Sequence, residues 1–179
     1  MFRLRMALSR RDLGALIAGA CLAPRAAHAD QPPAAPATFT VTSRGGRHKA
    51  VLEFPAREVK VFAVKGKQNS PLWTVPGWSP VAAVSDSGPT LAMGHPGNNL
   101  LPLNADEGTV IFSLYQQGRL VREVKLGEIL PLPRLRRTIS HVEWGTHVGF
   151  DATGRYRVEA VDKRVLAFPI TGEPETVRR

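Results

Sequence analysis

The stretch "TVIFSLYQQGRLVREVKL", residues 109–126, carries the clearest secondary-structure signal in the sequence. Val110, Phe112 and Leu114 are apolar and separated by single residues, which is the period-two pattern of a strand with one face in a core. The Gln-Gln-Gly that follows, residues 116–118, places a glycine where a tight hairpin needs a positive φ. A second β-prone run comes directly after it. The stretch therefore predicts an antiparallel hairpin with one buried face.

The same texture of short β-prone runs between turn residues continues from Thr38 onward, and in residues 155–160 apolar side chains again alternate with charged ones. The predicted strands are 39–42, 50–54, 58–64, 72–75, 81–85, 90–93, 109–115, 119–126, 147–150, 155–161 and 164–170. The helical candidate is the short segment 127–130, because Pro131 and Pro133 end it. We therefore predict a single all-β domain over 38–179, with one irregular crossing at about 127–140.

Two hairpins resemble each other in sequence. Residues 81–94, "VAAVSDSGPTLAMG", and 147–160, "HVGFDATGRYRVEA", each combine an apolar strand, an aspartate, a turn with glycine and a second strand. This order resembles the blades of β-propellers, which are built from repeated antiparallel sheets. At ~40 to 50 residues per blade the chain supplies about three blades, fewer than propellers usually contain. We expect blade-like antiparallel sheets packed as a sandwich or a partly open barrel, with a partial propeller completed by oligomerisation as the alternative.

Residues 9–30, "SRRDLGALIAGACLAPRAAHAD", have the features of an export signal. Arginines precede an apolar run too short to span a bilayer, which needs ~20 residues. Ala27 and Ala29 offer small side chains before a cleavage site, so we expect a cleaved signal over 1–29. Arg10 and Arg11 resemble the twin-arginine export motif, which implies export by that route; an ordinary general-secretion signal is the alternative.

The expected product of cleavage is a periplasmic or secreted protein without a membrane span. It would begin with "DQPPAAPA", residues 30–37, a Pro- and Ala-rich spacer. The whole chain of 179 residues has a formal net charge of +9, and without residues 1–29 it would carry +5, an ordinary value for a small soluble domain. The basic balance is therefore no argument for nucleic-acid binding. Cys21, the single cysteine, leaves with the signal, so no disulfide or thiolate chemistry is expected.

Two polar loops are the candidate binding elements. The loop 94–99 presents His95, held between a glycine and a proline, together with Asn98 and Asn99. The segment 131–137 holds the strongest basic cluster after two prolines. Its arginines are Arg134, Arg136 and Arg137. They predict contact with the acidic surface of an envelope protein partner, with anionic lipid as the alternative.

A metal site is a weaker candidate. His141 and His147 could share a metal ion only if Gly145 folds the chain between them back on itself, because an extended segment separates them by about 20 Å. The candidate metal ligands are His95, His141 and His147, with Glu143 or His48 as a further ligand. The spacing matches no standard zinc or calcium loop. No cofactor is predicted.

The sequence contains no Gly-x-Ser-x-Gly elbow, no His-Glu-x-x-His and no glycine-rich phosphate loop before a helix. Ser140 precedes His141, but in a strand consecutive side chains point to opposite faces. We therefore predict binding rather than catalysis: an exported accessory or scaffold module for another envelope protein. The alternative is a small periplasmic enzyme or metal-binding protein that uses His95, His141 and His147. The oligomeric state stays open.

Overall fold

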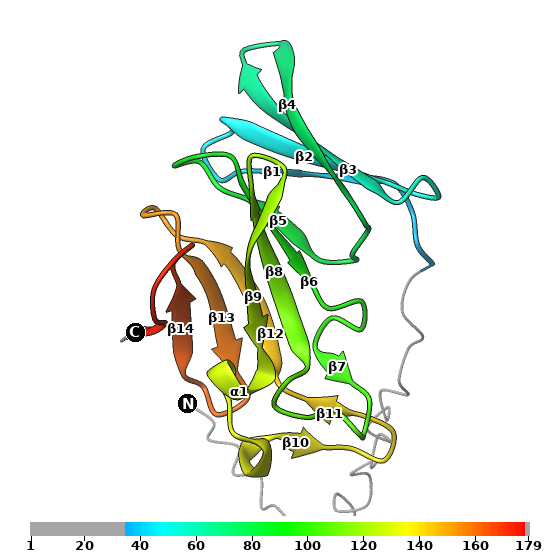
Figure 1. Ribbon diagram of the computed structural model, residues 1–179, viewed down its shortest axis with the longest axis vertical. Helices are drawn as coiled ribbons and strands as arrows, with labels where there is room; N and C mark the ends of the chain where they lie inside the picture. The colour runs from blue at the N-terminus through cyan, green and yellow to red at the C-terminus, as the bar shows by residue number, and fades with distance from the viewer. Residues whose placement is uncertain (1–34, 178–179) are drawn as a thin grey trace, which may run out of the picture. The chain divides into compact units, whose positions relative to one another are not determined.

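Antiparallel strands make up nearly all the regular structure of residues 35–177, which are the residues that the computed structural model describes (Figure 1). The predicted all-β class is confirmed. All the described residues belong to one compact unit. The residues of the predicted export signal lie outside this range: Arg10, Arg11, Ala27 and Ala29. No helix among the described residues is long and apolar enough to cross a membrane.

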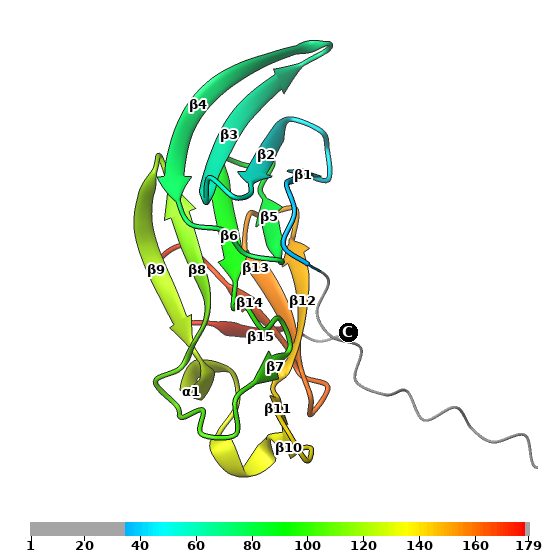
Figure 2. The same ribbon diagram turned by 90° about the vertical axis from the view of Figure 1, so that its right-hand side faces the viewer.

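Three of the four sheets are four-stranded meanders, in which strands that follow one another along the chain lie side by side, except that β7 intervenes between β6 and β8 (Figures 1 and 2). The first sheet has the order β1-β2-β3-β4, the second β5-β6-β8-β9 and the third β12-β13-β14-β15. A small sheet has the order β10-β11-β7. Within residues 35–177 no sheet closes into a barrel, which is consistent with the predicted packing of antiparallel sheets as a sandwich.

The strands of the first two large sheets are β1 (Phe39–Thr42), β2 (His48–Glu53), β3 (Glu58–Lys65), β4 (Gln68–Pro76), β5 (Ala82–Val84), β6 (Thr90–Gly94), β8 (Val110–Gln116) and β9 (Arg119–Lys125). The third sheet contains β12 (Gly145–Phe150), β13 (Tyr156–Ala160), β14 (Val165–Phe168) and β15 (Glu175–Val177). The small sheet contains β7 (Leu100–Leu101), β10 (Arg136–Arg137) and β11 (Val142–Glu143). The helices are α1 (Leu126–Ile129) and the 3-10 helix η1 (Leu132–Arg134).

The predicted hairpin at 109–126 is β8 and β9, with one change in its buried face. The pairing register shifts between Val110 and Phe112, so Ile111 is buried next to Phe112 while Val110 is only half-buried. Such a bulge places an extra residue in one strand and interrupts strict alternation. Leu114 is buried as predicted.

The predicted turn glycines are confirmed in two of the three hairpins. Gly118 has a φ of 76° and Gly154 a φ of 81°, as a tight turn requires. Gly88 does not have a positive φ, so the prediction for the turn 85–88 is wrong.

The larger hydrophobic core lies between the second and third sheets. Its centre is Phe112, whose ring centroid is 4.8 Å from that of Tyr156 and 5.3 Å from that of Phe168. Tyr156 and Val158 are buried, which confirms the predicted face of β13. A smaller core packs the first sheet against β5 and β6.

The structure adds short strands that periodicity does not predict: β7, β10, β11 and β15. They have two or three residues each, too few to show a period. The expected irregular crossing at 127–140 therefore contains β10 as well as η1, and the helix lies one residue earlier than predicted.

Candidate functional site

A cleft of about 1150 Å³ lies where the first strands of the three four-stranded sheets meet. Its walls come from β1, β5 and β12, from the turns that follow these strands and from Arg157 of β13, and we call it the turn cleft. Both β1 and β12 lie against β5. Each turn contributes polar residues, among them Arg44 and Arg47 from the first, Asp86 from the second and Asp151 from the third.

Asp86 fastens the turn of the first sheet to the turn of the second. Its carboxylate accepts hydrogen bonds from the Ser43 hydroxyl at 2.5 Å, from the Gly45 amide at 2.5 Å and from the Arg47 amide at 3.3 Å. The Ser43 hydroxyl bond is the largest of the effects that hold the pKa of Asp86 below its usual value. The Asp86 carboxylate is thus engaged by the protein's own turn.

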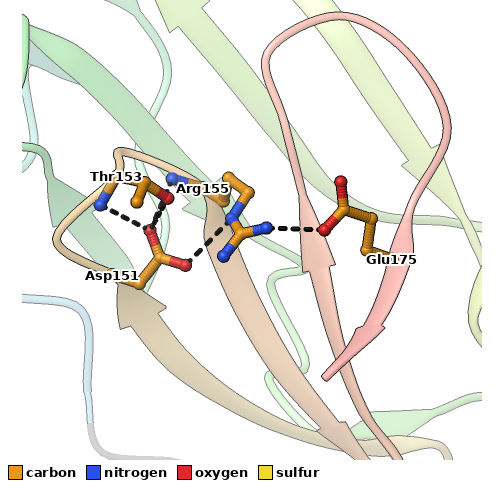
Figure 3. Close-up of polar contacts among 4 residues, drawn as sticks. All are labelled: Asp151, Thr153, Arg155 and Glu175. Atoms are coloured by element: carbon orange, nitrogen blue, oxygen red, sulfur yellow. Dashed lines mark hydrogen bonds and ion pairs between the residues drawn. The ribbon is translucent and has the colours of Figure 1, made fainter. Parts of the chain in front are cut away.

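Asp151 closes its own turn instead (Figure 3). One carboxylate oxygen accepts from the amide and hydroxyl of Thr153, at 2.9 and 2.7 Å, and from the Arg155 amide at 3.0 Å. The Arg155 guanidinium spans the other oxygen of Asp151, at 3.1 Å, and Glu175, at 2.6 Å. Burial favours the neutral acid, but the Thr153 and Arg155 bonds outweigh it and lower the pKa of Asp151. The two aspartates of the similar hairpins therefore have different partners.

The guanidinium groups of the cleft are left without such partners. Those of Arg44, Arg47 and Arg157 form no hydrogen bond or ion pair with any residue of 35–177, although the charge of Arg47 helps to lower the pKa of Asp86. Nε of Arg157 is buried without a hydrogen-bond partner in this part of the chain. Because both carboxylates are engaged and these three cations are not, the cleft favours an anionic ligand.

Apolar surface lies beside these cations. Val148 is the bulged residue of β12, where the register shifts between His147 and Gly149, and its side chain is 53% exposed. Phe150 and the β5 residues Ala82 and Ala83 also line the cleft. Bulges at sheet edges commonly re-aim a side chain next to a site. The arrangement can hold an elongated ligand with both apolar and anionic groups.

Both predicted binding loops lie next to the small sheet. The loop with His95, Asn98 and Asn99 leads into β7, which pairs with β11, and β11 pairs with the arginine-bearing strand β10. The Trp144 indole donates to the Asn98 carbonyl at 3.0 Å, and Asn98 has a φ of 56°. Sequence reasoning proposed the two loops separately and did not foresee this pairing.

The predicted basic cluster is exposed, but its charge is partly balanced. Arg134 lies 3.5 Å from Asp162, Arg136 forms an ion pair with Glu143, and Arg137 donates to the Leu103 carbonyl at 3.4 Å. In the turn between β10 and β11, Ile139 is 99% exposed. We call residues 134–143 the arginine hairpin.

The three candidate histidine ligands are not gathered. Residues 35–177 contain no group of three or more His, Cys, Asp or Glu side chains placed to hold a metal ion. His147 is half-buried beside the larger core, with its Nδ1 3.1 Å from the Tyr156 hydroxyl and its ring centroid 5.0 Å from that of Trp144. Burial, and then the charge of nearby His95, lowers the pKa of His147 to about 4. His141 lies in the turn of the arginine hairpin.

One sequence-based statement about catalysis is wrong. Ser140 and His141 do not point apart: the serine hydroxyl lies 2.8 Å from Nδ1 of the histidine. The reason is that residues 138–141 form a turn, closed by the bond from the Thr138 amide to the His141 carbonyl, rather than a strand. The pair lies at the exposed tip of the arginine hairpin and does not line the turn cleft.

Asp86→Ala is expected to loosen the turn at 43–47 and to lower the free energy of unfolding by about 1 to 3 kcal/mol, because the buried Ser43 hydroxyl and the exposed Gly45 and Arg47 amides lose their acceptor. Hydrogen exchange of the Gly45 and Arg47 amides should accelerate. Asp106→Ala is the matched control, since Asp106 binds only within its own exposed turn, to Thr109. Equal exchange rates in wild type and D86A would contradict the assignment.

Comparison with known proteins finds no protein family and no curated protein that matches this sequence.

Proposed function

We propose that this chain is a binding domain that holds an anionic partner in the turn cleft, and that it acts as an exported accessory or scaffold module for another envelope protein. The observation that carries the proposal is the imbalance between engaged carboxylates and unpaired guanidinium groups in the cleft. A planar guanidinium binds a carboxylate or phosphate through two parallel hydrogen bonds. Arg44, Arg47 and Arg157 therefore supply the attraction.

The rigidity of the surrounding turns supports the same function. Asp86 and Asp151 hold their turns in place through internal hydrogen bonds, so little conformational freedom remains to be lost when a ligand binds. Binding loops on a sheet scaffold commonly owe their specificity to such preorganisation. The predicted export signal supports a location outside the cytoplasm, and an acidic envelope protein is the anionic partner proposed there.

A second surface for the same kind of partner is the arginine hairpin. Its specific support is Ile139, a large apolar side chain that is 99% exposed beside Arg136 and Arg137. Exposed apolar side chains within a charged rim are typical of protein contacts. The ion pairs of Arg134 and Arg136 weaken its attraction for acidic groups, so the turn cleft ranks first.

Two variants with the same change of charge distinguish the turn cleft from the arginine hairpin as the binding surface. In the cleft variant Arg44, Arg47 and Arg157 become serine; in the hairpin variant Arg134, Arg136 and Arg137 become serine. Binding of a poly-glutamate peptide of about ten residues is measured by calorimetry from ~50 to ~300 mM salt, because salt screens such attraction. We expect the cleft variant to bind at least about tenfold more weakly and the hairpin variant to bind nearly as well as wild type.

If both variants lose the same affinity for the peptide, the loss reflects net charge alone and contradicts the proposal. If only the hairpin variant loses affinity, the binding site is the arginine hairpin and not the turn cleft. The exposed pair Arg44 and Arg47 is also changed alone, because Arg157 is half-buried and its replacement can disturb folding. The hairpin variant should melt within a few degrees of wild type, since exposed ion pairs contribute only about 0 to 1 kcal/mol each. Circular dichroism measures this melting temperature.

A further inference from the structure

Resting on the proposed function, we propose that the occupant of the turn cleft is an extended peptide with acidic side chains, which adds as a strand to a free sheet edge inside the cleft. The cleft is bordered by β1, β5 and β12, and each of these is the terminal strand of its sheet. We call their unpaired sides the inner edges. An extended peptide can pair with such an edge through main-chain hydrogen bonds.

The residues of the inner edges differ from those of the other strand edges. Proteins block exposed edges with charged residues or proline, because an open edge recruits other strands. The terminal strands on the far sides of the large sheets carry such residues: Pro71 in β4, Arg119, Arg122, Glu123 and Lys125 in β9, and Glu175 in β15. The strands β1, β5 and β12 contain no lysine, arginine, aspartate, glutamate or proline. The inner edges therefore carry none of the charged residues or prolines that block the far edges.

Backbone groups are available along these edges. The Ser85 amide donates to the Thr90 carbonyl and the Gly94 amide donates to the Val81 carbonyl, so residues 81 and 85 face β6. Because the direction alternates along a strand, the amides and carbonyls of Ala82 and Val84 face away from β6. By the same alternation Thr42 faces away from β2, since the Ser43 amide donates to the His48 carbonyl.

The side chains that line the cleft indicate which residues the bound peptide should contain. The cleft volume of about 1150 Å³ exceeds the ~300 to 1,000 Å³ of most small-molecule sites, which favours a larger occupant such as a peptide segment. A paired strand presents alternate side chains to opposite faces. Acidic side chains would meet Arg44, Arg47 and Arg157, and apolar ones would pack on Val148 and Phe150. The geometry points to a peptide in which acidic and β-branched residues alternate.

Backbone methylation of the peptide tests the proposal without changing its charge. The probe is acetyl-Thr-Val-Glu-Val-Glu-Val-Thr-amide, compared with two derivatives N-methylated at the odd or at the even positions. Methylation removes the donors on one side of the strand. Titration calorimetry should show that at least one derivative binds about tenfold or more weakly than the parent peptide, the effect of losing one or more hydrogen bonds. Amide signals of Thr42, Ala82 or Val84 should shift on titration with the parent.

The controls distinguish this proposal from the one on which it rests. If both methylated peptides bind as tightly as the parent while the cleft variant loses binding, strand addition is wrong and the anionic cleft stands. If the parent peptide and poly-glutamate bind wild type and the cleft variant equally, the proposed function itself is wrong. The peptide with glutamine in place of both glutamates should bind at least about tenfold more weakly; unchanged affinity would contradict the acidic part of the proposal.

Discussion

Phe112→Ala is expected to lower the free energy of unfolding by about 3 to 5 kcal/mol, the usual cost of removing a buried aromatic side chain. Phe112 is 1% exposed and lies between the second and third sheets, in ring contact with Tyr156, Phe168 and His147. Alanine leaves a cavity among these rings, because their backbones belong to separate paired strands and cannot all move inward. Equilibrium unfolding in urea measures the loss.

Leu120→Ala is the matched control for this change. Leu120 lies on the neighbouring strand β9 and its side chain is 50% exposed, so its truncation should cost less than about 1 kcal/mol. If F112A and L120A unfold at similar urea concentrations, Phe112 does not join the two sheets and the description of the larger core is wrong.

Acid is expected to destabilise the fold through His147. Its pKa is lowered from 6.5 to about 4 by burial and by the charge of His95, while the unfolded chain keeps the ordinary value. Between these two values the unfolded state binds a proton that the folded state does not, so the stability falls as the pH falls from 6.5 to 4. The full difference corresponds to about 3 kcal/mol, and below pH 4 the contribution of His147 no longer changes.

Unfolding free energies of wild type and His147→Gln, measured in urea from about pH 7 to pH 4, test this contribution. The variant keeps a polar partner for the Tyr156 hydroxyl but does not titrate, so its stability should depend less steeply on pH. Burial also lowers the pKa of His95, so some slope remains in H147Q. His141→Gln, a change in the turn of the arginine hairpin, is the control for replacing a histidine outside the larger core. Identical slopes in wild type and H147Q would refute the role of His147.

The sequence predicts best those hairpins in which apolar and polar residues alternate clearly and a glycine marks the turn. The pair β8 and β9 and the pair β12 and β13 are of this kind, because alternation and a turn glycine act within about 15 neighbouring residues. The failures have specific physical causes. The bulge between Val110 and Phe112 interrupts alternation, and β7 pairs with β11, which is distant in the sequence.

The turn cleft lies beyond sequence reasoning for a different reason. Asp86 looks like an ordinary turn residue, yet its partners Ser43 and Gly45 are 43 and 41 positions away. The arginines of the cleft come from two separate sheets, and Arg157 is more than 100 positions from Arg44 and Arg47, unlike the compact cluster at 134–137. Clustering in the sequence therefore indicates the arginines at 134–137, which are partly paired, and gives no sign of the unpaired arginines of the cleft. A signal was present in the uncharged strands 39–42 and 82–84, which lack the residues that block sheet edges.

The meander order of the three large sheets has a consequence for the kinetics of folding. Each sheet is continuous in sequence apart from the β7 segment, so its pairing closes only short loops, whereas the bonds of Asp86 to the first turn span more than 40 positions. Short-range contacts form early because they cost less chain entropy. We expect each sheet to pair as soon as its strands have been synthesised, and the turns to interlock afterwards. A nascent chain that ends at Lys125 would hold two sheets but lack β12 and Arg157, so binding competence is gained only with the last quarter of the chain.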